Sequence, residues 1–460
     1  MIRVMRRVGM LLSAAVVLGL LFSCATAPEP VEPEPELPAD PYQSISLLVQ
    51  AGEAAAAIDE FQRAELTAPD EPETMVMLAN LYLIAGQPEA AEELLSSVLQ
   101  EAPEQPQALY SLALIQNSRG DRARSRELLE QAVAADPEYA DAHAALGEIL
   151  LESRSPRGAR RAFQTAVELD EQNFVARVGL GNALLQLQEY ESAEQELTEA
   201  VELEPEYPFG WADRARARIG TGNNRGAIDD LTQAIQLQPD YPFHYLDRGR
   251  VYARINQPEE ALQDYQRALE LRPDDFFILA RKADTLFSLG RSQEASDAYV
   301  AVLQQRRDYH PAFVPLAVVS FELENWDRAY RFFRDSFERD QQNPGLALAA
   351  SLSLKLDGRE QEGRRFLAER ARDLPREGAL WAVSRFYQAP GSDNLAIREL
   401  QNLGSDEDVL RTQLEFYMGA QYLLNGRDST ARSFLTRAAE SNYTGLPELR
   451  MARALLERLE

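Results

Sequence analysis

The sequence predicts an all-α protein, an α/α solenoid of about twelve helix-turn-helix repeats of 34 residues with a capping helix at the C-terminus. The first observation is a series of prolines spaced by 34 residues or multiples of 34, at Pro69, Pro103, Pro137, Pro205, Pro239, Pro273 and Pro375. The second is a small residue twelve positions before this series, with a large apolar residue four positions after it, as in Ala57 and Phe61. A spacing of four places both residues on one helical face.

A second series of small residues precedes the first by twelve positions, which is the length of one helix and a turn. Its members are Ala79, Ala113, Gly147, Gly181, Ala215, Gly249, Ala283 and Ala317. Small residues at matching heights allow two antiparallel helices to approach closely. Glycines such as Gly86 and Gly120 are expected to end the first helix of a repeat, and the prolines separate its second helix from the next repeat.

The first 23 residues have the pattern of a targeting signal. Three arginines precede an apolar run over residues 8–22, which is short for a membrane span and has the charged-then-apolar order of a secretory signal. The run ends in Leu-Phe-Ser-Cys24, which resembles the lipobox of bacterial lipoproteins, although Phe22 is bulkier than the usual residue. The resemblance implies cleavage of a signal peptide over 1–23 and acylation of Cys24, for example with palmitate. The alternative is an ordinary cleaved signal or an uncleaved anchor.

Residues 24–41 are expected to form a tether behind the lipidated cysteine. Residues 25–41 contain six prolines and five acidic residues, a composition that favours an extended chain over a helix. In Gram-negative lipoproteins an aspartate after the cysteine often signals retention in the inner membrane. Ala25 occupies that position here, so the expected location is the outer membrane, facing the periplasm.

The repeat pattern resembles the tetratricopeptide repeat superfamily from about residue 42 to residue 443. Residues 242–275 match closely, with Tyr245 at the fourth position, Gly249 at the eighth and Tyr252 at the eleventh. The resemblance implies a right-handed superhelix. It also implies that the first helices of successive repeats line a concave groove, which binds an extended peptide or a partner helix.

The regular array is expected over residues 42–387 and a degenerate repeat over 388–405. The register of the pattern continues through this stretch, but Gly363 and Ile397 stand where alanines are expected. Shortened helices and a possible hinge are therefore predicted near residue 390. A C-terminal repeat over 406–445 restores the pattern, and an amphipathic segment over 446–460 should cap the last apolar face.

Composition excludes several classes of function. The net charge of −27 opposes binding to nucleic acid. One cysteine and three scattered histidines, His143, His244 and His310, argue against a metal site. The sequence contains no phosphate-binding loop, nucleophile elbow or zinc-protease motif, and its acidic residues are spread along helical faces. We therefore expect a protein without enzymatic activity, catalytic residues, cofactor or metal.

A candidate partner-binding surface is predicted on three successive first helices. Position two of these repeats is phenylalanine each time, and arginines occupy position nine of two repeats and a site one turn further on. The candidate residues are Phe209, Arg216, Phe243, Arg250, Arg254 and Phe277. Arginine and aromatic residues dominate interaction hot spots. The alternative is that the phenylalanines fill the joints between repeats.

Other residues near this surface have a structural interpretation. Arg214 and Arg248 are expected to pair with Asp230 and Asp264 on the second helices of their own repeats. Asn80 and Asn182 match one position of the carboxylate clamp of chaperone-binding relatives. Ser111, Asp141 and Ala145 stand where the clamp needs asparagine and basic residues, so that mode of recognition is rejected.

These observations together predict a membrane-anchored scaffold of the bacterial cell envelope that binds protein partners through its groove. By resemblance, its duties could lie in outer-membrane, secretion or pilus assembly. One alternative is an accessory regulator or recruiter of peptidoglycan enzymes. Another is a glycan-binding module, in which Phe209, Trp211, Phe243 and Tyr245 stack on sugars.

Overall fold

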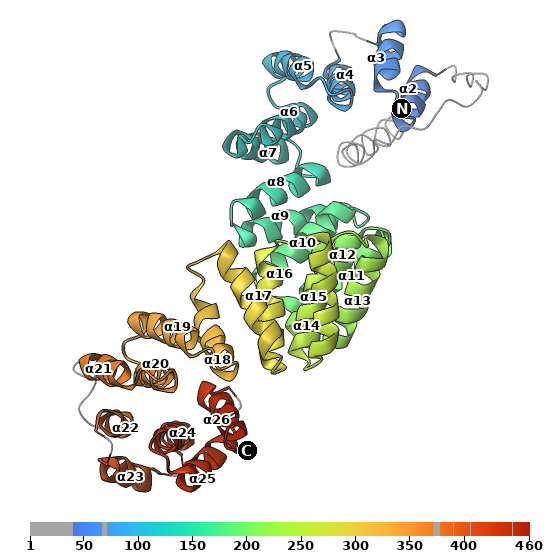
Figure 1. The fold of residues 1–460 in the computed structure, drawn as a ribbon. Helices are drawn as coiled ribbons and strands as arrows, with labels where there is room; N and C mark the ends of the chain where they lie inside the picture. Colours follow the sequence, from blue (N-terminus) through green and yellow to red (C-terminus); the bar gives the residue numbers. More distant parts are fainter. Residues whose placement is uncertain (1–39, 67–70, 371–377, 390, 405, 444) are drawn as a thin grey trace. The chain divides into compact units, whose positions relative to one another are not determined.

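The computed structural model describes residues 40–66, 71–370, 378–389, 391–404, 406–443 and 445–460. Within these ranges the chain forms twenty-five α-helices and one short 3-10 helix, η1 (His310–Ala312), and no strand (Figure 1). The predicted signal peptide, Cys24 and the tether up to residue 39 lie outside the described residues. No helix in the described ranges has both the length and the apolar character that a bilayer span requires.

The chain divides into two compact units after Asp230, and the boundary falls within α13. Helices of the N-terminal unit pack in consecutive pairs, from α2 with α3 to α10 with α11, as the helix-turn-helix pattern predicts. They are α2 (Pro41–Gln50), α3 (Ala54–Arg63), α4 (Pro72–Ile84), α5 (Pro88–Glu101), α6 (Pro106–Ser118), α7 (Arg122–Ala135), α8 (Ala140–Glu152), α9 (Pro156–Leu169), α10 (Phe174–Gln186), α11 (Tyr190–Leu203), α12 (Pro208–Thr221) and α13 (Asn224–Leu237).

The predicted tether is one residue too long, because helix α2 begins at Pro41. Asp40 is the N-cap of this helix, and its side chain accepts a hydrogen bond from the Tyr42 amide at 3.1 Å. Proline is favoured at the first helical position because it has no amide hydrogen to leave unpaired and its φ angle is already helical. Pro41, one of the prolines that suggested an extended chain, therefore starts the first helix.

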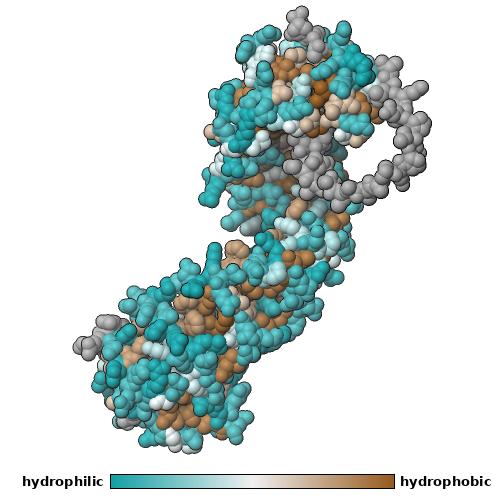
Figure 2. All heavy atoms as spheres, turned by 45° about the horizontal axis from the view of Figure 1, so that its top comes forward, coloured by the Kyte–Doolittle hydropathy of each residue, from teal (hydrophilic) through white to brown (hydrophobic). Residues whose placement is uncertain are grey.

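The predicted series of small residues lie at the seams between paired helices. Ala57, Ala79, Ala91 and Ala113 are completely buried. Close approach is required around Phe163 on α9, because a Cβ atom would lie 2.8 Å from its ring at Gly147 and 2.3 Å at Gly179. On the face shown in Figure 2, hydrophilic residues cover most of the surface, with smaller hydrophobic patches among them.

The C-terminal unit continues the helix pairs and ends on an additional helix. Its elements after α13 are α14 (Pro242–Arg254), α15 (Pro258–Leu271), α16 (Phe276–Ser288), α17 (Ser292–Gln305), η1, α18 (Phe313–Glu322), α19 (Trp326–Arg339), α20 (Pro344–Leu356), α21 (Glu360–Arg370), α22 (Ala379–Gln388), α23 (Asp393–Asn402), α24 (Asp408–Leu424), α25 (Asp428–Ala439) and α26 (Pro447–Glu457). The shortening predicted near residue 390 is confirmed, since α22 and α23 have 10 residues each. The hinge stays a prediction.

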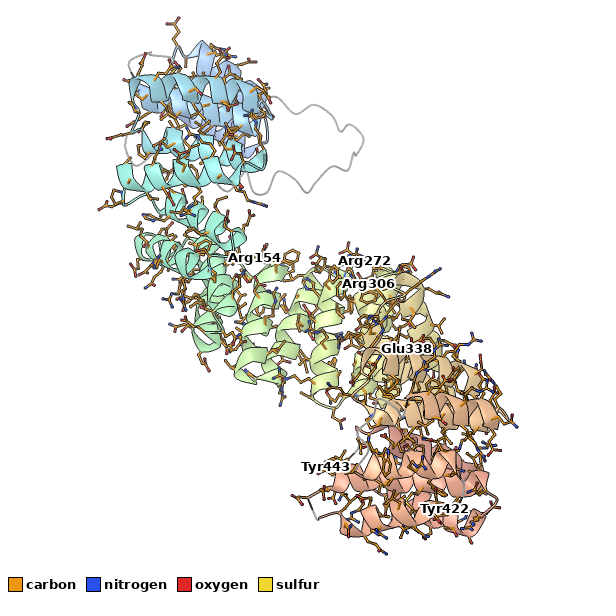
Figure 3. The ribbon with its side chains drawn as sticks, turned by 90° about the vertical axis from the view of Figure 1, so that its left-hand side faces the viewer. Arg154, Arg272, Arg306, Glu338, Tyr422 and Tyr443 are labelled. Carbon is orange, nitrogen blue, oxygen red and sulfur yellow. The ribbon has the colours of Figure 1, made fainter. Side chains whose placement is uncertain are left out.

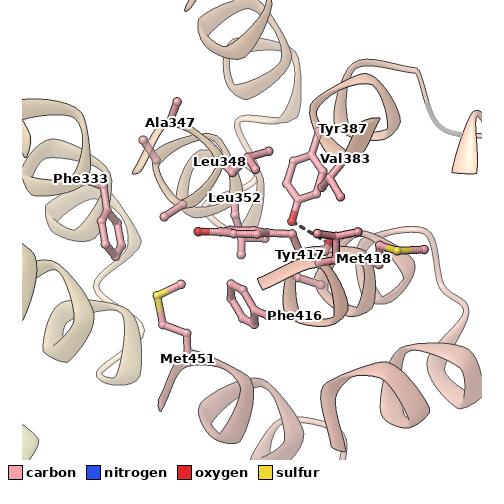
Figure 4. Close-up of a cluster of buried hydrophobic side chains, with 14 of the residues drawn as sticks. Phe333, Ala347, Leu348, Leu352, Val383, Tyr387, Phe416, Tyr417, Met418 and Met451 are labelled. Carbon is pink, nitrogen blue, oxygen red and sulfur yellow. Dashed lines mark hydrogen bonds between the residues drawn. The ribbon is translucent and has the colours of Figure 1, made fainter. Parts of the chain in front are cut away.

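Helix α24 lies inside the last part of the array instead of lining an open groove. Every residue from Leu414 to Tyr422 is buried, and α24 packs against α20, α22 and α26 as well as its partner α25. Phe416, Tyr417 and Met418 join Leu348 and Leu352 in one hydrophobic core (Figure 4). In this region the first helix α24 contacts both α22 and α20, so it is covered by first helices of two preceding repeats.

Helix α26 closes this core by contacting α18, which precedes it by four repeats. The Arg450 guanidinium binds the Glu322 carboxylate with N–O distances of 2.6 and 2.7 Å. It also donates to the Phe287 carbonyl and lies 4.1 Å from the centroid of the Phe287 ring. The final helix therefore caps the array and also contacts helices far from it in sequence.

A lysine side chain is buried in the same core and connects two of its helices. Lys355 is 4% exposed, and its ammonium donates to the Tyr387 carbonyl at 2.8 Å and to Gln421 Oε1 at 2.7 Å. Neither acceptor carries a negative charge, so burial lowers the pKa of Lys355 to about 7. The core therefore contains one amine whose protonation changes near neutral pH.

Because of this lysine, we expect the free energy of unfolding to rise with pH. Between pH 7 and 10.5 the unfolded chain binds more protons at Lys355 than the folded chain does. The free energy of unfolding should therefore increase by up to about 1.4 kcal/mol per pH unit in this window. Urea unfolding at several pH values should show this increment in the parent and lack it in Lys355→Met. Equal pH dependence in both chains would contradict the prediction.

Candidate protein-interaction site

The six predicted partner-binding residues divide between the two units. Phe209 and Arg216 lie on α12 of the N-terminal unit, and the other four lie on α14 and α16 of the C-terminal unit. Arg216 and Arg250 are exposed, and each pairs with an aspartate three residues earlier, at N–O distances of 2.6 and 3.3 Å. These local pairs orient the guanidinium groups and leave part of each open to solvent.

The predicted phenylalanines are members of aromatic pairs at the starts of the helices. Phe209 contacts Tyr207 at a centroid distance of 5.6 Å, and Phe243 contacts Tyr241 at 5.4 Å. Phe277 contacts Phe276 at 5.4 Å and is 63% exposed, the most exposed large hydrophobic side chain in the described residues. Phe277 is therefore the strongest aromatic contact candidate, while Phe209 and Phe243 are half-buried.

The C-terminal unit also carries arginines that the groove prediction missed. The Arg272 guanidinium lies 5.2 Å from the Phe243 ring, Arg306 lies 4.5 Å from Phe276, and Arg339 lies 5.7 Å from Phe313. We call these six residues the arginine–aromatic row. Each distance is within the range of a cation–π contact. Arg272 and Arg306, one repeat apart, follow the ends of α15 and α17 (Figure 3).

The sequence held a signal for this row. Arg272 directly precedes the repeating proline Pro273, and Arg306 lies one repeat length after Arg272. Their ring partners begin the first helices, so the row lies where one repeat connects to the next. Arginine and aromatic side chains at an exposed edge can bind carboxylates and apolar groups of a protein partner.

The two predicted structural ion pairs are confirmed. Asp230 accepts from Arg214 at 2.7 and 3.0 Å, and Asp264 accepts from Arg248 at 2.7 and 2.9 Å. Arg218 adds a second cation beside Asp230 at 2.8 Å. Burial raises the pKa of Asp264, and the hydrogen bonds from Arg248 oppose that increase. These arginines connect the two helices of a repeat.

The residues considered for glycan stacking have structural contacts. Trp211 Nε1 donates to the Pro205 carbonyl at 2.8 Å, and the Tyr245 hydroxyl donates to the Pro239 carbonyl at 3.1 Å. His143 makes the equivalent contact with Pro137 at 3.0 Å. In these repeats the side chain at the fourth position therefore forms a hydrogen bond with the segment that connects its helix to the preceding repeat.

The asparagines that resemble one part of a carboxylate clamp contact the next repeat. Asn80 Oδ1 accepts from the Ser111 hydroxyl at 2.7 Å, and Asn182 donates to Asp213 at 2.8 Å. His244 is buried against Tyr241, and burial lowers its pKa to about 4. The described residues contain no group of histidine, cysteine and acidic side chains able to hold a metal ion.

Several solved structures are similar to parts of the chain. MamA is 22% identical, with 35% of this chain and 95% of that chain covered, at a TM-score of 0.34. YrrB, described as a TPR protein with an unusual peptide-binding site, is 22% identical. The match covers 40% of this chain and 95% of YrrB, at a TM-score of 0.35. The C-terminal part of a TPR repeat-containing protein from Cytophaga hutchinsonii is 16% identical. The match covers 52% of this chain and 97% of that chain, at a TM-score of 0.39. A search of curated proteins gave no match.

Three tetratricopeptide repeat family models match the sequence. The first matches residues 48–115 and 150–217, the second residues 244–275 and the third residues 110–173. The matched stretches cover consecutive helices and the buried small residues at their seams. The chain therefore contains tetratricopeptide repeats, a helical scaffold for protein interaction.

Proposed function

We propose that this protein is a lipid-anchored adaptor of the bacterial cell envelope that binds protein partners through its repeats. The observation that carries the proposal is the arginine–aromatic row of the C-terminal unit together with the exposed Phe277. The guanidinium groups of Arg272, Arg306 and Arg339 are exposed, although acidic residues such as Asp275, which lies 3.8 Å from Arg272, share the same connections. The row suits a partner segment with acidic and apolar side chains.

Anchoring explains how modest contacts would suffice. Acylation of Cys24 would hold the repeats in a thin layer at the membrane, and the Pro/Glu-rich segment behind it would give them reach. Partners in the same membrane would then meet the row at a raised effective concentration. Ala25 favours the outer membrane, with the repeats in the periplasm, where outer-membrane, secretion or pilus assembly takes place.

The anchor is tested by replacing Cys24 with serine in the full-length precursor. The parent should incorporate labelled palmitate and sediment with membranes, whereas Cys24→Ser should incorporate none. Cys24 is the only cysteine of the chain, and a serine hydroxyl cannot form the thioether, so the variant removes the only acceptor of its kind. Equal labelling of both chains would contradict lipidation at Cys24.

Partner binding is tested by photo-crosslinking from position 277 in intact envelopes. A photoreactive phenylalanine analogue at this exposed position should give a discrete set of crosslinked proteins. The matched control is the analogue at Val409, which is also on a first helix of the C-terminal unit and is 39% exposed. Identical products from both positions would indicate nonspecific capture and contradict a partner surface at Phe277.

A further inference from the structure

A pocket of about 370 Å³ lies in the C-terminal unit and shares only Phe313 and Arg339 with the arginine–aromatic row. Its apolar wall includes Phe313, Phe333 and Met451, and its polar wall includes Tyr417 and Glu448. The Tyr417 hydroxyl points toward Phe333 in Figure 4. A volume of this size suits a small ligand or a single long side chain.

Glu448 is the unusual member of this lining. It is 4% exposed, and its Oε1 atom accepts from Gln413 at 3.0 Å and lies 3.2 Å from the Tyr417 hydroxyl, which also donates to the Gly345 carbonyl at 2.8 Å. Its Oε2 atom is buried and receives no hydrogen bond from any residue that the structure describes. A buried carboxylate oxygen without a donor is costly, so a ligand that supplies an N–H group would satisfy it.

The charges around the pocket favour a cation. Asp340 adds a second carboxylate to the lining, against one guanidinium, that of Arg339, which lies over the Phe313 ring. Burial raises the pKa of Glu448, and hydrogen bonds from its own backbone amide and from Gln413 and Tyr417 oppose this rise. A bound ammonium group would stabilise the ionised carboxylate directly, and aromatic rings beside it add a cation–π attraction.

From this geometry we infer that the pocket binds a primary alkylammonium group, with the ammonium at Glu448 Oε2 and the alkyl arm along Phe313, Phe333 and Met451. The group can belong to a small free amine or to a lysine side chain of a polypeptide. Both sources present the same chemistry to Glu448. The inference does not depend on the lipid anchor, and it uses Phe313 of the arginine–aromatic row only as part of the apolar wall.

The test is calorimetric titration of the full chain at pH 8 with n-butylamine, n-butanol and Nα-acetyl-lysine methylamide. n-Butylamine should bind saturably, and n-butanol should bind at least tenfold more weakly because it lacks the charge. A lysine derivative that binds tenfold tighter than n-butylamine identifies a polypeptide lysine as the natural source. The reverse order identifies a free amine.

Two variants separate recognition from folding. Glu448→Gln keeps the acceptor for Gln413 and Tyr417 and should weaken n-butylamine binding at least tenfold, whereas Glu457→Gln, on the exposed face of the same helix, should leave it unchanged. Gly345→Ala would place a methyl group 3.1 Å from Asn343 Oδ1 and in ordinary contact with Glu448 Oε1 at 3.5 Å, so it fills space beside the carboxylate and should also weaken binding without changing charge. Absence of saturable binding by the parent, or equal affinity in Glu448→Gln, would overturn the inference.

Discussion

Replacing Asp230 with alanine is expected to destabilise the N-terminal unit by about 3–5 kcal/mol. The Asp230 carboxylate is 3% exposed and accepts from both Arg214 and Arg218. Its removal would leave two guanidinium groups, with exposed fractions of 10% and 20%, without this buried counter-charge. The destabilisation comes mainly from the two guanidinium groups left buried without their counter-charge, since a buried ion pair by itself adds little net stability.

Urea unfolding of the full chain, followed by circular dichroism, measures this effect. Glu127→Ala is the matched control, because Glu127 forms an exposed ion pair with Arg124, with 57% and 48% of the two side chains exposed. Such a pair contributes less than about 1 kcal/mol. If Asp230→Ala were no more destabilising than Glu127→Ala, the buried arginine network would not hold the repeat together as described.

Replacing Phe416 with alanine is expected to destabilise the C-terminal unit by about 3–5 kcal/mol. Phe416 is completely buried on α24, and its ring lies 4.8 Å from that of Tyr417 in the core of Figure 4. A truncated side chain there would leave a cavity among helices that contact α24 from several repeats. The destabilisation should therefore affect helices α18 to α26 together.

Hydrogen exchange of the backbone amides can detect this spread. Phe416→Ala should accelerate exchange in α18, α20, α24 and α26, whereas Phe277→Ala should leave it close to the parent, since Phe277 is 63% exposed. Surface substitutions of that kind usually change stability by less than about 0.5 kcal/mol. Acceleration confined to α24 and α25 would contradict the closed core, because it would mean that the repeats contact only their immediate neighbours.

The sequence was sufficient to predict the helical repeats and their internal pairing. Small residues at seams such as Ala57 and Ala79, and ion pairs such as Arg214 with Asp230, involve partners within one repeat or between neighbours. Their spacing is therefore visible as a period along the chain. The same periodicity located the shortened helices near residue 390.

The closed C-terminal core could not be predicted in this way. Its contacts join residues separated by several repeats, such as Lys355 with Gln421 and Arg450 with Phe287, and no local period records them. Glu448 looks ordinary in sequence, since proline followed by an acidic residue is typical of a helix N-terminus. Its burial and unpaired oxygen depend on α20, α24 and α26 packing together.

The candidate binding surface was predicted only in part. The phenylalanines at position two were visible from their repeat spacing. Arg272, which lies over Phe243, and Arg306, which lies over Phe276 next to the predicted Phe277, follow the ends of second helices and were not predicted. A contact between Phe243 and Arg272 depends on how the connection between repeats folds back. Whether the six predicted residues contact a partner stays a prediction.

The most direct measurement of the central claim, partner binding through the arginine–aromatic row, is quantitative photo-crosslinking from position 277 in a charge-reversed background. Arg272→Glu with Arg306→Glu should abolish the products formed by the parent in the envelope. Arg291→Glu with Arg331→Glu is the control, because it makes the same charge change on exposed arginines that pair locally with Glu294 and Asp327. Loss of the products only in the first variant is the predicted result, and unchanged products in that variant would contradict the claim.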